Sequence, residues 1–400
     1  MGDAIAAVLG QVFREEAGRV TASLTRRYGD FDLAEECTQE AFLSALRAWS
    51  EQGIPSRPGA WLQRVAERRV LDRLRRAQRH AAKSSLISEP DSPGGDDRLQ
   101  LMFACCHPAL SRDAQVALTL RVVAGLSTAQ IASAFLVSES SLAQRITRAK
   151  RKIVSAGIPF RIPDPADLEE RLAEVMAVLY LMFNEGYLSS QWEVSSDRSL
   201  AEDATWLAGL AVQVLPAQPE LLGLLALFKL QLSRVRSRFD GEGRMVLLAD
   251  QDRSMWNRAA ISEATDLLDR AALIGRPGPY QLQAAIASCH ALAPRWADTD
   301  WPLLVRLYDR LLEVQPSPVV RLNRAVALWH VAGAAVALGE TEALLPALQG
   351  YHLVHSTRAE LLQELGRDAE AQASWDRALA LTLNPAERGH IRSQTGASIE

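Results

Sequence analysis

Apolar residues recur at the three- and four-residue spacing of an α-helix in segment after segment of this 400-residue chain. After Asp167 the same spacing continues to about residue 392, and no stretch there alternates apolar and polar residues as a strand does. Ala, Leu, Arg and Glu favour helices and are abundant, whereas aromatic residues make up only 6% of the chain. The pattern predicts an all-α protein, and the length predicts two or three domains.

Stretches rich in Pro, Gly, Ser or Asp interrupt the helical pattern at residues 53–59, 84–97 and 157–165. The first of these breaks separates helices within one domain, and the other two predict domain boundaries. The sequence thus predicts a helical domain over 1–80, a flexible linker over 81–97, a second helical domain over 98–157 and a long helical domain over 158–400.

The charges of the two halves have opposite signs. Residues 1–158 carry 22 Lys and Arg against 17 Asp and Glu, a net charge of +5, and residues 159–400 carry 22 against 31, a net charge of −9. This asymmetry predicts different partners for the two halves. Four cysteines are too few for a disulfide framework, and no signal peptide or membrane span is evident. We therefore expect a cytoplasmic protein without a membrane partner.

The sharpest local signal is a predicted helix-turn-helix over residues 125–153, GLSTAQIASAFLVSESSLAQRITRAKRKI. Ser127 and Ser138 are typical N-caps, and Leu142, Ile146 and Ile153 line one face of the second helix. Residues 142–152 hold five basic side chains and no acid. A lone basic helix is equally well a solvated bundle helix, but the preceding helix and turn favour insertion into a major groove. The predicted DNA-facing residues are Ser138, Glu139, Ser141, Gln144, Arg145, Arg148 and Lys152.

A second basic helix is predicted after residue 60, and residues 61–83 have a net charge of +6. Such a density suits a nucleic-acid backbone, because binding releases the counterions of the phosphates. The aromatic residue at its start either stacks on an unpaired base or anchors the helix in the core, and by itself it favours the core. The candidate residues are Trp61, Arg64, Arg68, Arg69, Arg73, Arg75 and Arg76.

The segment DFDLAEECTQEAFLSALRAW, residues 30–49, is a predicted acidic helix with five carboxylates before its first basic residue, Arg47. Their spacing does not suggest a metal site, and their charge excludes a DNA-binding face. A protein partner is the better interpretation.

These three segments, in this order, resemble a bacterial RNA polymerase sigma factor of the extracytoplasmic-function type, and the resemblance covers residues 1–157. It implies that DLAEECTQEAF docks on the polymerase clamp, that PGAWLQRVAERRVLDRLRR handles the promoter minus-10 element, and that the helix-turn-helix reads the minus-35 element. The implied polymerase contacts are Asp32, Glu35, Glu36, Gln39 and Glu40. The chain departs from the family at Arg68, where the minus-10 helix often carries Asn.

About 240 further residues follow the part that resembles a minimal sigma factor. Residues 358–385 resemble a tetratricopeptide (TPR) helical hairpin, and Gly333 and Gly366 lie 33 residues apart, close to the TPR period of about 34. Together with LMFACCHPALSRDAQVALTLR, YLMFNEGY and GPYQLQAAIASCHA, this is similar to the subgroup with a long helical, regulatory C-terminal extension. We expect a TPR-like superhelix that meets a protein or peptide.

The sequence thus predicts a sigma factor that binds core RNA polymerase and promoter DNA, needs no cofactor and is not an enzyme. Cys105, Cys106 and His107 invite a metal site, but no second pair of ligands matches them, and packing is the better interpretation. The alternative function is a TPR-type sensor or scaffold that acts as an ordinary helix-turn-helix operator-binding regulator. The acidic helix argues against it, because such a regulator has no use for a polymerase-binding site.

Overall fold

The computed structural model describes residues 2–80, 97–135, 137–188, 200–241, 244–382 and 384–395. These residues form helices and connecting turns, with no strand among them and one isolated β-bridge between Phe239 and Met245. The all-α prediction is confirmed. No helix of the described part of the chain combines the length and the apolar character that a membrane span requires. The predicted linker at 81–97 lies outside the described residues except for Asp97.

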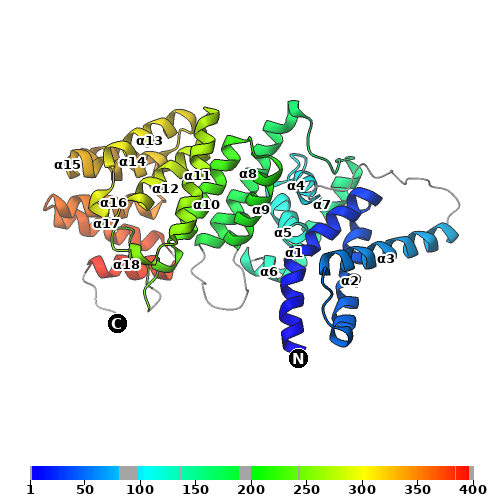
Figure 1. The fold of residues 1–400 in the computed structure, drawn as a ribbon. Coiled ribbons are helices and arrows are strands. Elements are labelled where there is room, and N and C mark those ends of the chain that lie inside the picture. The colour runs from blue at the N-terminus through cyan, green and yellow to red at the C-terminus, as the bar shows by residue number, and fades with distance from the viewer. Residues whose placement is uncertain are drawn as a thin grey trace. The chain divides into compact units, whose positions relative to one another are not determined.

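The chain folds into two compact units, the first reaching Val214 and the second formed mainly by the residues from Leu215 onward. The helices of the first unit (Figure 1) are α1 (Gly2–Tyr28), α2 (Phe31–Gln52), α3 (Pro58–His80), α4 (Arg98–Cys105), α5 (Arg112–Val122), α6 (Thr128–Ala134), α7 (Glu139–Ser155), α8 (Pro165–Leu188) and α9 (Leu200–Val214). The predicted boundary at residue 157 therefore does not separate the two units, because α8 and α9 belong to the first.

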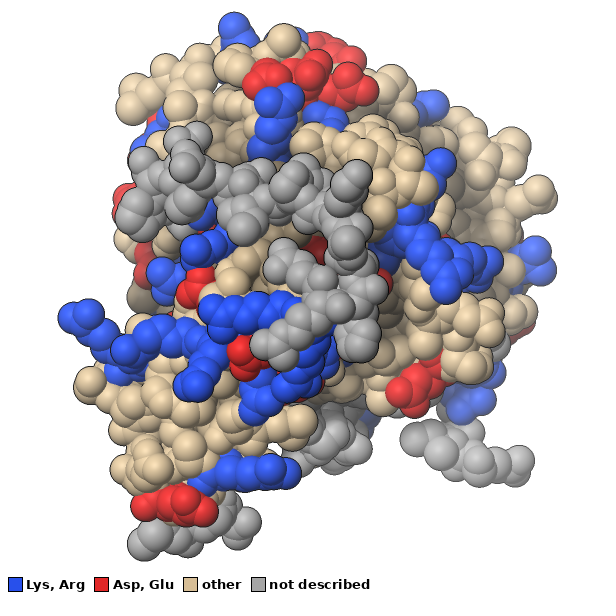
Figure 2. Space-filling model, turned by 90° about the vertical axis from the view of Figure 1, so that its right-hand side faces the viewer, with Lys and Arg blue, Asp and Glu red and all other residues tan. Residues whose placement is uncertain are grey.

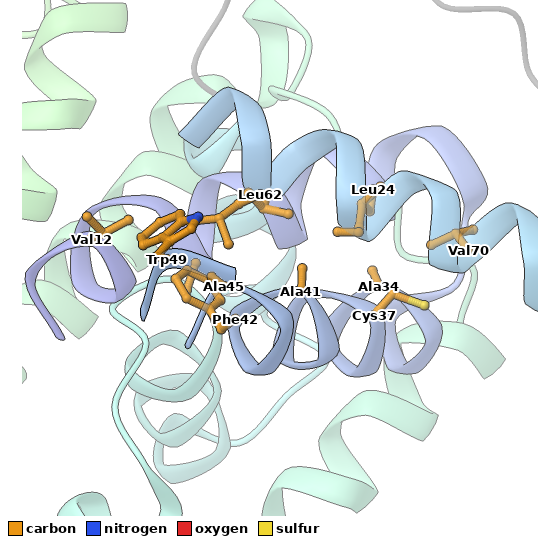
Figure 3. Packing of buried hydrophobic residues seen from close by; sticks show 13 residues of the cluster. Val12, Leu24, Ala34, Cys37, Ala41, Phe42, Ala45, Trp49, Leu62 and Val70 are labelled. Carbon is orange, nitrogen blue, oxygen red and sulfur yellow. The ribbon is translucent and has the colours of Figure 1, made fainter. Parts of the chain in front are cut away.

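Helices α1, α2 and α3 share one hydrophobic core (Figure 3). Leu24 from α1, Trp49 from α2 and Leu62 from α3 are fully or almost fully buried in it. Asp30 caps α2 by accepting a hydrogen bond from the backbone N–H of Leu33, which satisfies one of the open donors of the first turn. This core fixes the three helices as a bundle and decides which of their polar faces meet solvent.

The predicted helix-turn-helix is formed by α6 and α7. The Ser127 hydroxyl accepts a hydrogen bond from the Gln130 N–H, and the Ser138 hydroxyl accepts one from the Ser141 N–H. Both predicted N-caps are thus confirmed. The predicted inward face of α7 is also confirmed, because its buried residues are Leu142, Ile146, Ala149 and Ile153.

Helix α8 packs against α4 and α5, beyond the predicted end of the helix-turn-helix domain. Arg171 of α8 donates a hydrogen bond of 2.6 Å to the carbonyl of Phe103, near the C-terminal end of α4, where helix carbonyls lack partners within the helix. Glu174 of α8 pairs with Arg112 of α5 at 2.9 Å. The Pro-rich stretch at 157–165 is therefore a turn within one unit, because the packing of the helix that follows decides where the unit ends.

The second unit is a succession of helices with short 3-10 turns. They are α10 (Pro219–Ser233), η1 (Val235–Ser237), η2 (Arg253–Met255), α11 (Arg258–Ile274), α12 (Pro279–Leu292), η3 (Trp296–Asp298), α13 (Trp301–Val314), α14 (Pro318–Ala332), α15 (Ala334–Leu348), α16 (His352–Glu364), α17 (Asp368–Leu381) and α18 (Pro385–Thr395). Helices α14 and α15 pack as one hairpin and α16 and α17 as the next. Gly333 and Gly366 lie at the two hairpin turns with φ of 84° and 70°, values that favour glycine. The 33-residue spacing thus marks equivalent turns.

Candidate nucleic-acid interface

The basic face of α3 is exposed. Figure 2 shows Lys and Arg side chains gathered on the side of the molecule where α3 lies, with few carboxylates among them. The predicted minus-10 residues that are exposed are Arg64, Arg68, Arg69, Arg75 and Arg76. Arg69 also lies 3.9 Å from a carboxylate oxygen of Glu40 and donates a hydrogen bond to Ser44 of α2, whereas the other four can meet a phosphate backbone without any change in the bundle.

Two of the predicted minus-10 residues occupy different surroundings from the rest. Arg73 is half-buried and pairs with Glu36 and Glu40 of α2, and hydrogen bonds to these carboxylates raise its pKa. Trp61 is also half-buried, and its ring meets Trp49 edge-on with the centroids 5.5 Å apart. The position of Trp61 agrees with the anchoring interpretation, in which the ring holds α3 against the core.

The outer face of α7 carries most of the residues predicted to face DNA. Those that are exposed are Ser138, Glu139, Ser141, Gln144, Arg148 and Lys152. Arg145 is half-buried and pairs with Asp113 of α5 at 3.4 Å. The face therefore offers an amide at Gln144 and two cations further along the helix, which suits base-edge contacts followed by phosphate contacts.

The carboxylates of α2 divide between two sets of cations. Asp32 and Glu35 pair with Lys150 of α7, and Glu35 also pairs with Arg121 of α5 at 2.8 Å. The other two carboxylates of the predicted polymerase face, Glu36 and Glu40, pair with Arg73 of α3. Each of the four carboxylates thus has a cation partner within the same unit.

An exposed stripe on α2 runs through Glu36, Gln39, Leu43 and Leu46. The two leucines are 62% and 45% exposed, which is unusual for large apolar side chains that lie together on one helix face. Sequence analysis did not assign them to a binding surface, although Leu43 lies four residues after Gln39 and Leu46 three residues after Leu43, which places all three on the same face. The stripe has the mixed polar and apolar character of a protein-binding surface.

The cysteines near the end of α4 lie in the interior. Cys105 and Cys106 are at most 1% exposed, and burial raises the pKa of the Cys106 thiol to about 12. Within the described residues, no group of three or more His, Cys, Asp or Glu side chains is arranged to hold a metal ion. The positions of both cysteines agree with the packing interpretation.

Comparison with known proteins assigns three segments. Residues 12–80 match the family described as Sigma-70 region 2, residues 100–153 match Sigma-70 region 4, and residues 171–272 match a family of unknown function, DUF6596. The chain is 46% identical over 386 residues to an uncharacterized protein of Rhizobium meliloti (strain 1021), covering 93% of this chain and 91% of that protein. No solved structure matches.

Proposed function

Because the chain belongs to the sigma-70 family of transcription initiation factors, we propose that it binds core RNA polymerase through α2 and places α3 and α7 on two promoter elements. Sigma-70 family factors are not enzymes, and their partners are core polymerase and promoter DNA. We assign this chain to the extracytoplasmic-function type, acting in the cytoplasm. The observation that carries the proposal is the presence in one compact unit of two exposed basic faces and a helix with an acidic, partly apolar outer stripe.

The two basic faces have different tasks in this proposal. The exposed arginines of α3 contact the minus-10 element, where the strands separate, because a dense row of cations stabilises closely spaced phosphates. The outer face of α7 enters the major groove at the minus-35 element, with Gln144 at a base edge and Arg148 and Lys152 on phosphates. The Arg68 side chain, which stands where the family often has Asn, adds charge to the first face.

The polymerase contact is the outer stripe of α2. Glu36 and Gln39 supply polar contacts to a basic partner surface, and Leu43 and Leu46 supply apolar area that is exposed in the free protein. Asp32, Glu35 and Glu40 complete the face.

The test is run-off transcription and core-polymerase retention with purified components. Leu43→Asp is expected to lower core retention at least about tenfold, because it places a charge in the apolar part of the contact. Val154→Asp is the matched control, since Val154 is 67% exposed on α7 and lies outside the proposed faces. Retention of the Leu43→Asp variant equal to that of the control would refute the polymerase site. Specific operator binding without transcription would instead favour the alternative regulator.

In our proposal, the first two helices of the C-terminal extension, α8 and α9, stabilise the DNA-binding unit; we call them the brace. The contacts of α8 with α4 and α5 support this, as does Arg98 of α4, whose guanidinium lies 4.6 Å from the ring centroid of Trp206 in α9. The remaining helices, TPR-like in their hairpin pattern, offer a surface for a protein or peptide partner.

Two truncations separate the brace from the regulatory part. Ending the chain after Pro159 removes α8 and α9 and is expected to abolish run-off activity and to lower the stability of what remains. Ending it after Val214 keeps α1 to α9 and is expected to keep run-off activity but lose control by the C-terminal partner. Equal activity of both truncations would refute the brace.

A further inference from the structure

In the second unit, aromatic side chains from the end of α12, from η3, from the start of α13 and from the end of α14 lie one against the next. We call them the ring row: His290, Trp296, Trp301, His330 and Trp329. His290 stacks on Trp296 with an interplanar angle of 8°, and Trp301 stacks on His330 with the ring centroids 3.8 Å apart. Trp296 meets Trp301 edge-on at 4.7 Å, and Trp329 lies 5.6 Å from His330. The ring row is therefore continuous across two helical hairpins.

The helical repeat itself does not require these rings. Trp329 and His330 precede the turn at Gly333 by four and three residues. At the same distances before the equivalent turn of the next hairpin stand Leu362, which is buried, and Gln363, which is exposed. A leucine and a polar residue thus suffice to build a hairpin of this kind, so the indole and the imidazole call for a reason beyond the fold.

The ring row is open to solvent and carries no charge. His330 is exposed, and the three indoles are half-buried. Burial, together with positive charges nearby, lowers the pKa of His290 to about 4, and partial burial lowers the pKa of His330, so both imidazoles are neutral near neutral pH. The charges next to the row in sequence, Arg295 and Asp298, pair with each other at 2.8 Å. An anionic partner such as nucleic acid therefore finds no free positive charge on the row.

The row also holds hydrogen-bond donors that the protein does not use. The Trp329 indole N–H donates a hydrogen bond of 2.7 Å to the carboxylate of Glu364. The indole N–H groups of Trp296 and Trp301 have no acceptor within the described part of the chain. Flat apolar faces next to unused N–H donors suit a partner that is apolar in its side chains and has free carbonyl groups in its backbone.

We propose that the ring row binds a proline-rich peptide in the polyproline II conformation. Proline rings pack on aromatic faces, and a polyproline II backbone has no internal hydrogen bonds, so its carbonyls can accept from the indole N–H groups. Centroid steps of 5.5, 3.8 and 5.6 Å lead along the row, and about five residues of such a peptide, at about 3.1 Å each, are long enough to cover it. The proposal deepens the proposed function, in which the helices after α9 offer a surface to a protein or peptide.

The test measures binding of fluorescein-labelled decaproline to the full chain by fluorescence anisotropy. We expect saturable binding with a Kd below about 1 mM, and binding at least about tenfold weaker for a Gly-Ser peptide of the same length. His330→Asp should weaken decaproline binding at least about fivefold, because it replaces a stacked ring by a charge. Gln363→Asp is the matched control, because it places the same charge at the corresponding exposed position of the next hairpin, and it should bind as wild type does.

Equal binding of the two peptides, or an equal loss in the two variants, would overturn the proposal. Tighter binding of an amphipathic helical peptide than of decaproline would also overturn it, because the occupant would then be a helix.

A second measurement uses the wild-type chain and does not depend on how a variant folds. With isotope-labelled tryptophan, the indole N–H signals of Trp296 and Trp301 should shift in NMR spectra when decaproline is added, and that of Trp49 in the core of the first unit should not. Spectra of Trp296→Phe and Trp301→Phe assign the two signals. Unchanged signals of both tryptophans would overturn the proposal.

Run-off transcription with the same preparation separates this proposal from the proposed function. Normal run-off activity without decaproline binding would overturn the peptide site alone. Decaproline binding without any run-off activity would support the site and refute the proposed function instead.

Discussion

Helices α3 and α7 are both basic and amphipathic, yet their ion pairs to the same acidic helix serve different purposes. Arg73 of α3 pairs with Glu36 and Glu40 inside a three-helix bundle whose core is shared by α1, α2 and α3. Lys150 of α7 reaches Glu35 across 115 positions of sequence, between two regions that match different families. The first pair joins helices that a shared core already holds together, whereas the second joins two regions that lie far apart in the sequence.

The comparison also shows that a count of basic residues does not give the number available to DNA. Both helices divide their cations between protein contacts and solvent. In α3, Arg73 is engaged with α2 while its neighbours Arg75 and Arg76 are exposed. In α7, Lys150 is engaged while Arg148 and Lys152 are exposed. The exposed subset is the one that variants should address first.

The largest effect is expected from removing exposed cations of α3. The triple variant Arg64→Ala, Arg68→Ala and Arg75→Ala should reduce open-complex formation at least about tenfold, because three potential phosphate contacts are lost. Permanganate footprinting of promoter thymines measures it. Arg73→Ala is the control, because Arg73 is the arginine of α3 that pairs with carboxylates of α2. This variant should leave the footprint nearly unchanged. An intact footprint in the triple variant would remove α3 from the minus-10 interface.

The next effect concerns sequence preference at α7. Gln144→Ala should weaken binding to the preferred minus-35 duplex by about tenfold and leave binding to unrelated duplexes unchanged, because an amide can form two hydrogen bonds with one base edge. Fluorescence anisotropy with a panel of duplexes that differ at single base pairs measures this. Equal weakening on every duplex would show that Gln144 contacts the backbone.

A smaller effect should distinguish two arginines of α7. Arg148→Ala should lower the slope of log K against log salt by about one and weaken duplex binding severalfold, as expected for one lost phosphate contact. Arg145→Ala should change the slope less, because Arg145 already pairs with Asp113. Binding titrations at several salt concentrations measure the two slopes. The reverse order of the two slopes would mean that DNA displaces Asp113 from Arg145.

Local patterns in the sequence were sufficient to predict the helix-turn-helix. The caps Ser127 and Ser138 and the buried stripe from Leu142 to Ile153 depend on neighbours within a few residues, so spacing alone predicts them. The same holds for the glycine turns at Gly333 and Gly366, whose 33-residue separation shows in the sequence as a repeat.

The features that sequence analysis did not predict depend on tertiary packing: the ion pairs of Glu35 and the unit to which α8 belongs. No local signal connects Arg121 or Lys150 with Glu35, because the contact exists only once two distant regions are packed together. The boundary placed at residue 157 came from a Pro-rich stretch, and such a stretch marks a turn without saying whether the next helix packs back. Arg171 and its hydrogen bond to Phe103 place α8 in the first unit, and only the structure reveals that bond.

The smallest effect should come from the ion pairs that brace α3 on α2. Arg73 and Glu36 are 36% and 60% exposed at their side chains, so solvent screens their interaction and the pair is expected to contribute only about 0.5 kcal/mol to the free energy of unfolding. A double-mutant cycle with Arg73→Ala and Glu36→Gln, followed by urea unfolding, measures this coupling energy. Arg76→Ala serves as the control for loss of a basic side chain on the exposed face of the same helix. A coupling energy above about 2 kcal/mol would contradict this expectation, because solvent-exposed ion pairs contribute at most about 1 kcal/mol.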